Sequence, residues 1–240
     1  MSATVPMFCE APSRVSTVLE LRAPLELLKF PQNIRNLSKA PRGDGRPVML
    51  LPGYLAGEQW MTPLQQYLSF IGYEVDAWGL GVNRGDVEGD IARFGERVAE
   101  AFEANGERPI TLVGWSLGGI IARETARLEP DRVREVITLG TPIIGGPKYT
   151  ALGAIYAASR GIDLDAFEKE VHARNAQGLT QPVTSIYSKN DGIVGWRASL
   201  DVYNSQANNI QVGGSHFALG FNPTVWRTIA DVMAMSKDAA

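Results

Sequence analysis

Short apolar runs alternate with helical patterns from about residue 45 almost to the end of the chain, and this alternation constrains the fold most. Apolar runs of about four to eight residues are typical of strands that are buried on both faces. Strands that are separated by helices favour a mainly parallel sheet flanked by helices, which is an α/β architecture. The runs predicted as buried strands are 48–51, 74–78, 110–115, 133–139 and 183–187, with a shorter apolar segment at 210–212.

Local signals predict where several helices begin. Thr62 precedes Pro63, and a glutamine follows three residues after Thr62, so we expect a helix that the Thr62 hydroxyl caps. Asn222 precedes Pro223 and predicts the cap of a final helix in the same way. The apolar residues between 91 and 102 recur at helical spacing and predict a helix with one buried face.

Two segments fall outside the alternation. Residues 147–181 contain helical patterns and no strand, so we predict a small helical cap inserted over the sheet; a structural excursion with no gating role is the alternative. In the N-terminal extension, residues 1–45, Leu21, Leu25 and Leu28 share one helical face that could pack on the domain.

Size and composition bound the remaining possibilities. With 240 residues, 45% of them hydrophobic, residues 1–240 are interpreted as a single domain. The net charge is -3 and no basic cluster stands out, which argues against a nucleic-acid partner or an anionic membrane surface. No stretch of about 18 apolar residues and no secretory signal pattern is found, so we expect no integral membrane association.

Cofactor and compartment follow from the cysteine count and from missing motifs. The only cysteine, Cys9, excludes an internal disulfide and a cysteine-rich metal site, and it fits a cytoplasmic protein. The sequence has no histidine-rich cluster and no phosphate-binding loop that ends in Gly-Lys-Ser or Gly-Lys-Thr. We therefore expect neither a metal nor an organic cofactor.

The strongest chemical signal is Gly114-Trp115-Ser116-Leu117-Gly118, followed by Gly119. It comes directly after an apolar strand and directly before a helical pattern, which is the context that a G-x-S-x-G nucleophile turn requires. Small residues two positions before and after the serine let neighbouring chain pass close to a strained turn. We therefore predict that Ser116 is a nucleophile, beside a helix N-terminus whose unpaired amides can stabilise an oxyanion.

A serine nucleophile needs a histidine base and a carboxylate that orients the base. Of the two histidines, His172 lies in the predicted cap and His216 in the loop after the last apolar segment, from which a base can reach the sheet edge. We assign His216 as the base and interpret His172 as a surface histidine. Asp191 follows the strand 183–187 directly, and although Asp-Gly is also a turn pair, the chain order Ser116, Asp191, His216 favours a catalytic acid.

This constellation resembles the α/β-hydrolase superfamily over about residues 47–235, and within it the small lipases and carboxylesterases with a helical cap. The resemblance implies a doubly wound sheet with the catalytic loops at the carboxyl ends of the strands. It also implies an oxyanion hole formed by the Leu117 amide and by an amide of the loop after the first core strand. Tyr54 is assigned as that second donor, and Leu55 remains an alternative.

Together these residues predict a serine hydrolase that cleaves a small-molecule or lipid-like carboxylic ester through an acyl-enzyme on Ser116. An acyltransferase or a thioesterase with the same triad is the alternative. A non-catalytic binding protein on the same fold is less favoured, because such proteins usually lack a triad member. Six aromatic residues could line an acyl pocket or pack in the core, namely Trp60, Trp78, Trp115, Trp196, Tyr149 and Tyr156.

Overall fold

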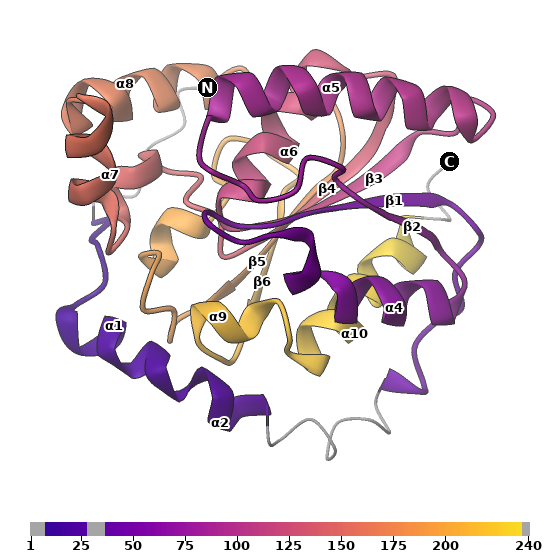
Figure 1. Ribbon diagram of the computed structural model, residues 1–240, viewed down its shortest axis with the longest axis horizontal. Helices are drawn as coiled ribbons and strands as arrows, with labels where there is room; N and C mark the ends of the chain where they lie inside the picture. The colour runs from indigo at the N-terminus through magenta and orange to yellow at the C-terminus, as the bar shows by residue number, and fades with distance from the viewer. Residues whose placement is uncertain (1–7, 28–36, 237–240) are drawn as a thin grey trace.

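A central sheet with helices on both sides organises the chain, as the computed structural model shows (Figure 1). The structure describes residues 8–27 and 37–236, apart from the side chains of Leu25 and Leu27. The elements are α1 (Arg14–Leu19), η1 (Glu20–Arg22), α2 (Ala23–Leu27), β1 (Pro47–Leu51), η2 (Glu58–Trp60), α4 (Thr62–Ile71), β2 (Glu74–Ala77), α5 (Val87–Ala104), β3 (Ile110–Trp115), α6 (Leu117–Leu128), β4 (Val133–Leu139), η3 (Gly146–Tyr149), α7 (Gly153–Arg160), α8 (Leu164–Asn175), β5 (Val183–Ser188), η4 (Trp196–Ser199), β6 (Asn208–Val212), α9 (His216–Leu219) and α10 (Pro223–Met235).

The strands of the described residues form one sheet of six, in the order β2-β1-β3-β4-β5-β6. Every neighbouring pair is parallel, so all carboxyl ends meet at the same edge of the sheet. The strand order reverses between β1 and β3, where α/β sheets commonly bind their ligands. The predicted α/β class, with its parallel sheet between helices, is confirmed.

One predicted strand differs in its environment. The segment 74–78 is predicted to be buried, but β2 alternates between exposed and half-buried residues, and only Trp78 just beyond it is fully buried. The reason is topological, because β2 is the edge strand beyond β1 and one of its sides has no neighbouring strand. An apolar run alone does not distinguish an edge strand from a central one.

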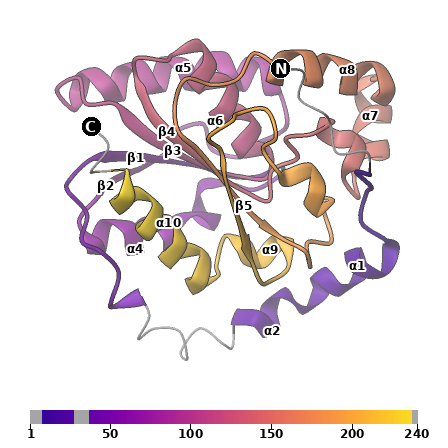
Figure 2. The ribbon, with the colours of Figure 1, turned by 180° about the vertical axis from the view of Figure 1, so that it is seen from behind.

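The helices pack on the two faces of the sheet. Buried residues of α4 and α10 join one face of β1, β3, β4 and β5 in one apolar cluster, whereas α5 and α6 cover the other face in a second cluster. Figure 1 and the reverse view in Figure 2 show these two layers on opposite sides of the strands. The sheet is therefore doubly wound. No helix among the described residues is both long enough and apolar enough to cross a membrane.

The two predicted helix caps have different outcomes. The Asn222 side chain accepts a hydrogen bond of 2.9 Å from the Thr224 amide, so this cap is confirmed. The prediction for Thr62 is wrong, because Thr62 is already the first residue of α4 and Met61, at the cap position, makes no side-chain capping bond. The preceding 3-10 turn η2 runs directly into α4, which moves the start of the helix.

Two segments lie beside the carboxyl ends of the strands. Between β4 and β5 the chain forms η3, α7 and α8, and both helices contact η3. The N-terminal segment, α1 to α2, lies along the lower side of the molecule in Figure 1, with α2 against α9. Of its predicted leucine face, Leu21 is 80% exposed and does not pack on the domain, whereas the Leu25 side chain and Leu28 lie outside the described residues.

Candidate active site

Ser116 occupies the turn between β3 and α6. Its backbone has φ 54° and ψ -120°, a conformation that costs a residue with a side chain about 1–3 kcal/mol. Two hydrogen bonds hold this turn: the Ser116 amide donates to the Leu139 carbonyl (2.8 Å), and the Thr141 hydroxyl donates to the Ser116 carbonyl (2.9 Å). The sequence therefore places the hydroxyl on a sharp, supported turn at the edge of the sheet.

Close packing explains the small residues around this turn. A Cβ atom on Gly118 would lie 2.5 Å from the Leu51 carbonyl oxygen and 2.6 Å from that of Pro52. A Cβ atom on Gly53 would lie 3.2 Å from the Ser116 Cβ atom. The loop after β1 therefore passes directly against the serine turn, and side chains at these positions would push the two apart.

Asp191 and His216 lie side by side at the same edge of the sheet. His216 Nδ1 is 2.7 Å from Asp191 Oδ2, and both side chains are almost fully buried. The other oxygen of Asp191 accepts the amides of Ile193 (2.9 Å) and Val194 (2.7 Å). With Nδ1 facing the carboxylate, the Nε2 atom of His216 is the one that can exchange a proton.

Burial and charge act in opposite directions on His216. Burial of the ring lowers its pKa, but the Asp191 carboxylate and, to a smaller extent, Glu20 raise it, and the net result is a pKa above the ordinary value. Within the described residues the Ser116 hydroxyl makes no hydrogen bond with His216. Such bonds are often long in unliganded active sites and tighten when substrate binds.

The amide of Tyr54 is free to act as an oxyanion donor, whereas that of Leu55 is not. The Leu55 amide donates a 2.7 Å hydrogen bond to the carbonyl of Asn83, and no described residue accepts a hydrogen bond from the Tyr54 amide. Leu117 is the first residue of α6, so its amide has no partner within the helix. The geometry favours Tyr54 over Leu55 as the donor beside Leu117.

Asn83 holds the loop that carries Tyr54, and sequence reasoning missed it. This buried side chain donates to the Pro52 carbonyl (2.9 Å) and accepts the Gly85 amide (3.1 Å). Its own amide donates to the Ala56 carbonyl (3.0 Å). A lone asparagine between a strand and a helix carries no motif, so only the folded structure reveals this contact.

The comparisons with known proteins agree with this fold. The sequence profile described as "alpha/beta hydrolase fold" matches residues 46–150. The chain has an α/β-hydrolase fold. Two solved α/β structures are similar in fold: a Bacillus licheniformis lipase (TM-score 0.61, 16% identity, covering 81% of this chain and 94% of that chain) and a putative aryl esterase from Burkholderia cenocepacia (TM-score 0.60, 16% identity, 83% and 93%).

Two curated relatives of the chain are esterases by name. The chain is 30% identical over 101 residues to the pimeloyl-[acyl-carrier protein] methyl ester esterase of a Shewanella strain, which covers 42% of this chain and 36% of the relative. It is 34% identical over 111 residues to the protein of the same name from Aliivibrio salmonicida, covering 45% and 40%. The match thus spans about two fifths of the length of these relatives.

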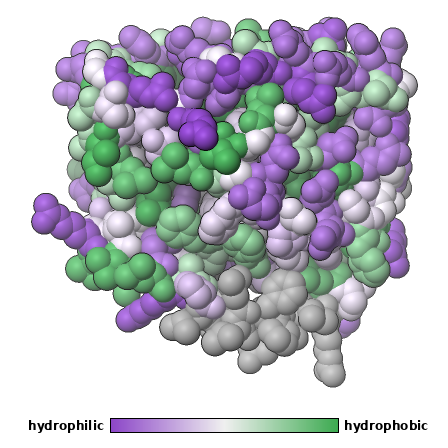
Figure 3. All heavy atoms as spheres, viewed as in Figure 1, coloured by the Kyte–Doolittle hydropathy of each residue, from purple (hydrophilic) through white to green (hydrophobic). Residues whose placement is uncertain are grey.

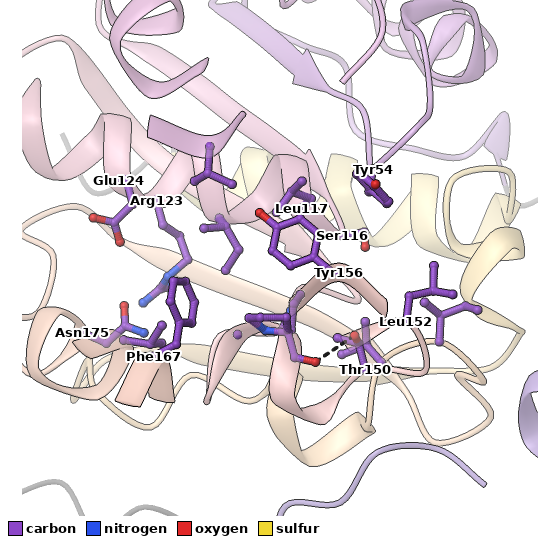
Figure 4. Close-up of a pocket in the computed structure, with 18 of the residues that line it drawn as sticks. Tyr54, Ser116, Leu117, Arg123, Glu124, Thr150, Leu152, Tyr156, Phe167 and Asn175 are labelled. Carbon is purple, nitrogen blue, oxygen red and sulfur yellow. Dashed lines mark hydrogen bonds between the residues drawn. The ribbon is translucent and has the colours of Figure 1, made fainter. Parts of the chain in front are cut away.

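A cavity of about 130 Å³ extends from Ser116 into the space between α6 and the helices α7 and α8. In Figure 4, Tyr54 and Ser116 lie at one end, and Arg123, Glu124 and Asn175 at the other. Most of the remaining lining is apolar, including Val87, Leu117, Ile120, Phe167, Val171 and Ile193.

The polar end of the cavity contains a buried ion pair. Arg123 Nη1 is 2.7 Å from Asp201 Oδ2, and the two side chains are 1% and 0% exposed. The second guanidinium nitrogen, Nη2, has no hydrogen-bond partner among the described residues. The cavity is therefore apolar along its length and carries charged side chains of both signs, Arg123 and Glu124, at its far end.

Most of the other residues considered from the sequence lie outside the cavity. His172 is on α8, with Nδ1 3.3 Å from the Tyr203 hydroxyl. Of the six aromatic residues considered for the pocket, Tyr156 lines it, whereas Trp78 and Trp115 are core residues and Trp196 stacks on Tyr187. Across residues 8–27 and 37–236, no group of three His, Cys, Asp or Glu residues is arranged to hold a metal ion.

Proposed function

We propose that this chain is a serine hydrolase, which cleaves carboxylic esters through an acyl-enzyme on Ser116. The observation that carries the proposal is the 2.7 Å contact of His216 with Asp191, at the sheet edge where the strained Ser116 turn meets the free Tyr54 amide. Nucleophile, base and acid come from three separate segments of the chain, and serine hydrolysis requires that these three groups lie close together.

The mechanism follows from these positions. His216 Nε2 takes the proton of Ser116 as the hydroxyl oxygen attacks the ester carbonyl, while Asp191 fixes the imidazole tautomer. The amides of Tyr54 and Leu117 stabilise the oxyanion. The tetrahedral intermediate releases the alcohol, which takes the proton from His216, and leaves an acyl-enzyme. Water then attacks the acyl-enzyme, giving its proton to His216, and the acid leaves as Ser116 recovers its hydrogen.

The cavity supports an acyl group that is largely apolar. Its lining offers few polar contacts along the length, and exposed apolar side chains, those of Leu55 (65%), Leu152 (42%) and Ile155 (70%), lie on neighbouring loops and on α7. Figure 3 shows apolar side chains on the face viewed in Figure 1, among them a group over α1. The unpaired Nη2 of Arg123 favours an acyl chain with a hydrogen-bond acceptor at its far end.

The relatives suggest the alcohol to test. They are named as methyl ester esterases of an acyl chain that is also joined to a carrier protein. We propose methyl esters of medium-chain acids, with or without a second carbonyl group at the far end, as the substrate class of this chain. A cytoplasmic location stays a prediction that rests on the single cysteine.

An ester panel tests the proposal. Wild-type protein and Ser116→Ala are compared on p-nitrophenyl esters of increasing acyl length and on methyl esters with plain or carbonyl-ended chains. We expect turnover only by the wild type, with a preference for the carbonyl-ended chains. Equal turnover by a folded Ser116→Ala protein would refute the proposal. Adding an alcohol to the assay separates hydrolysis from acyl transfer.

A further inference from the structure

The N-terminal segment packs directly on the loop that carries Asp191. The Thr17 hydroxyl donates a 2.8 Å hydrogen bond to the Gly192 carbonyl. A Cβ atom on Gly192 would overlap the carbonyl oxygen of Ser16, and one on Gly195 would overlap that of Glu10. Both glycines are thus needed for the approach of a segment that begins about 170 residues earlier in the chain.

Glu20 of η1 contacts the backbone of both catalytic loops. Its Oε1 atom accepts the amide of Gly192 (2.7 Å), next to Asp191, and the amide of His216 itself (2.8 Å). Its Oε2 atom accepts the amide of Phe217 (3.1 Å). The side chain is 5% exposed, so these amides have no competing water, and one carboxylate joins the acid loop to the base loop.

We propose that Glu20 is a positioning residue of the active site, which holds the loops of Asp191 and His216 in register and places a second negative charge beside the imidazole. This inference rests on the proposed function of Ser116 and explains why the N-terminal segment belongs to the active site. The carboxylate does not touch the reacting atoms; it acts through His216 and Asp191. No signal in the sequence around residue 20 predicts this role.

The charges around His216 define what the loss of Glu20 would change. The Asp191 carboxylate faces the His216 ring directly, and Glu20 accepts a hydrogen bond from the His216 backbone amide. Glu26 of α2 accepts a hydrogen bond of 3.1 Å from the neighbouring Ser215 amide. Asp191 and Glu20 both raise the His216 pKa, whereas Glu26 is not among the causes of that shift. Glu26→Gln is therefore a matched control that removes the same charge from the same segment.

The experiment compares full-length wild type, Glu20→Gln, Glu20→Asp and Glu26→Gln on a p-nitrophenyl ester across pH. In Glu20→Gln, a side-chain NH2 group, which can only donate, replaces one carboxylate oxygen and faces a backbone N–H group of the base loop, which also donates. The negative charge is lost as well. We expect kcat to fall about 10- to 100-fold with little change in KM, because the loops lose their register. The acid limb of kcat/KM should move to lower pH. Glu20→Asp, which keeps the charge, should lower kcat but leave the acid limb near its wild-type position, and Glu26→Gln should not move the limb.

Titration of the His216 ring by NMR measures the same charge effect without turnover. A lower His216 pKa in Glu20→Gln, with no change in Glu26→Gln, supports the inference. An unchanged kcat and an unchanged His216 pKa in Glu20→Gln would overturn it, as would a fall in kcat that only matches the loss of folded protein seen by circular dichroism. Esterase activity that survives in Ser116→Ala would instead refute the proposed function, and the NMR titration would still decide the role of Glu20.

Discussion

The substitution Gly118→Ala tests whether the serine turn and the oxyanion loop depend on one close approach of two backbones. The added Cβ atom would lie 2.5 Å from the Leu51 carbonyl oxygen and 2.6 Å from the Pro52 carbonyl oxygen. Distances below 3.0 Å are essentially never seen for a Cβ atom, so the two backbones must separate by at least about 0.5 Å. Backbone on both sides cannot move aside as a flexible side chain would.

The separation acts on catalysis through Tyr54, which follows Pro52 by two residues. A displacement of about 1 Å can cost about 100-fold in rate, and loss of one oxyanion donor costs on the order of 100- to 1000-fold. A shift of about half that size should therefore lower kcat by about 10- to 100-fold. KM should change less, because residues of α6 and of the segment between β4 and β5, and not the loop after β1, line most of the acyl cavity.

The assay is steady-state hydrolysis of a p-nitrophenyl ester, with thermal unfolding measured on the same samples. Gly95→Ala is the control, because the nearest atom to its added Cβ, Glu129 Oε1, is 4.0 Å away and the residue lies within α5. This control should keep its kcat and gain about 0.5–1 kcal/mol of stability from helix propensity. A folded Gly118→Ala protein with kcat within twofold of wild type would refute the reasoning.

Three further substitutions test other parts of the site. Wild-type kcat/KM should fall as pH drops through the raised His216 pKa, because only the neutral imidazole is a base. Asp191→Asn should lower kcat on the order of 10,000-fold and move this fall in kcat/KM to lower pH, which a pH series measures. Asn83→Ala leaves two buried backbone groups without partners, so we expect a loss of about 2–6 kcal/mol in the free energy of unfolding, measured in urea, and a lower kcat; a stability equal to wild type would contradict this. Arg123→Met leaves Asp201 buried without its cation, so unfolding should need about 3–5 kcal/mol less and the melting temperature should fall by about 6–20 °C, as calorimetry would show.

The parts of the structure that the sequence could predict are those encoded by neighbouring residues. The strands appear as local apolar runs, and β3 is found at the predicted residues, 110–115. The serine turn is visible in the same way, because its glycines and its flanking elements are contiguous. Pairing of Asp191 with His216 followed from their place after strands, since parallel strands bring such loops to one edge.

The contacts that the sequence could not predict join segments far apart in the chain. Glu20 contacts His216 across 196 positions, and nothing in its neighbourhood distinguishes it from a surface glutamate. The choice between Tyr54 and Leu55 as oxyanion donor depends on a single carbonyl, that of Asn83, which only the folded loop places. Likewise the edge position of β2 is a property of strand order, which no local pattern contains.

The most direct test of the central claim is covalent labelling of the nucleophile. Wild-type protein is treated with a fluorophosphonate, residual ester hydrolysis is measured, and the modified residue is located by tandem mass spectrometry. We expect a single phosphonate on Ser116, formed in step with the loss of activity, and slow labelling when His216 is replaced by alanine. An adduct at another residue, or full ester hydrolysis by protein that carries the label on Ser116, would contradict the account.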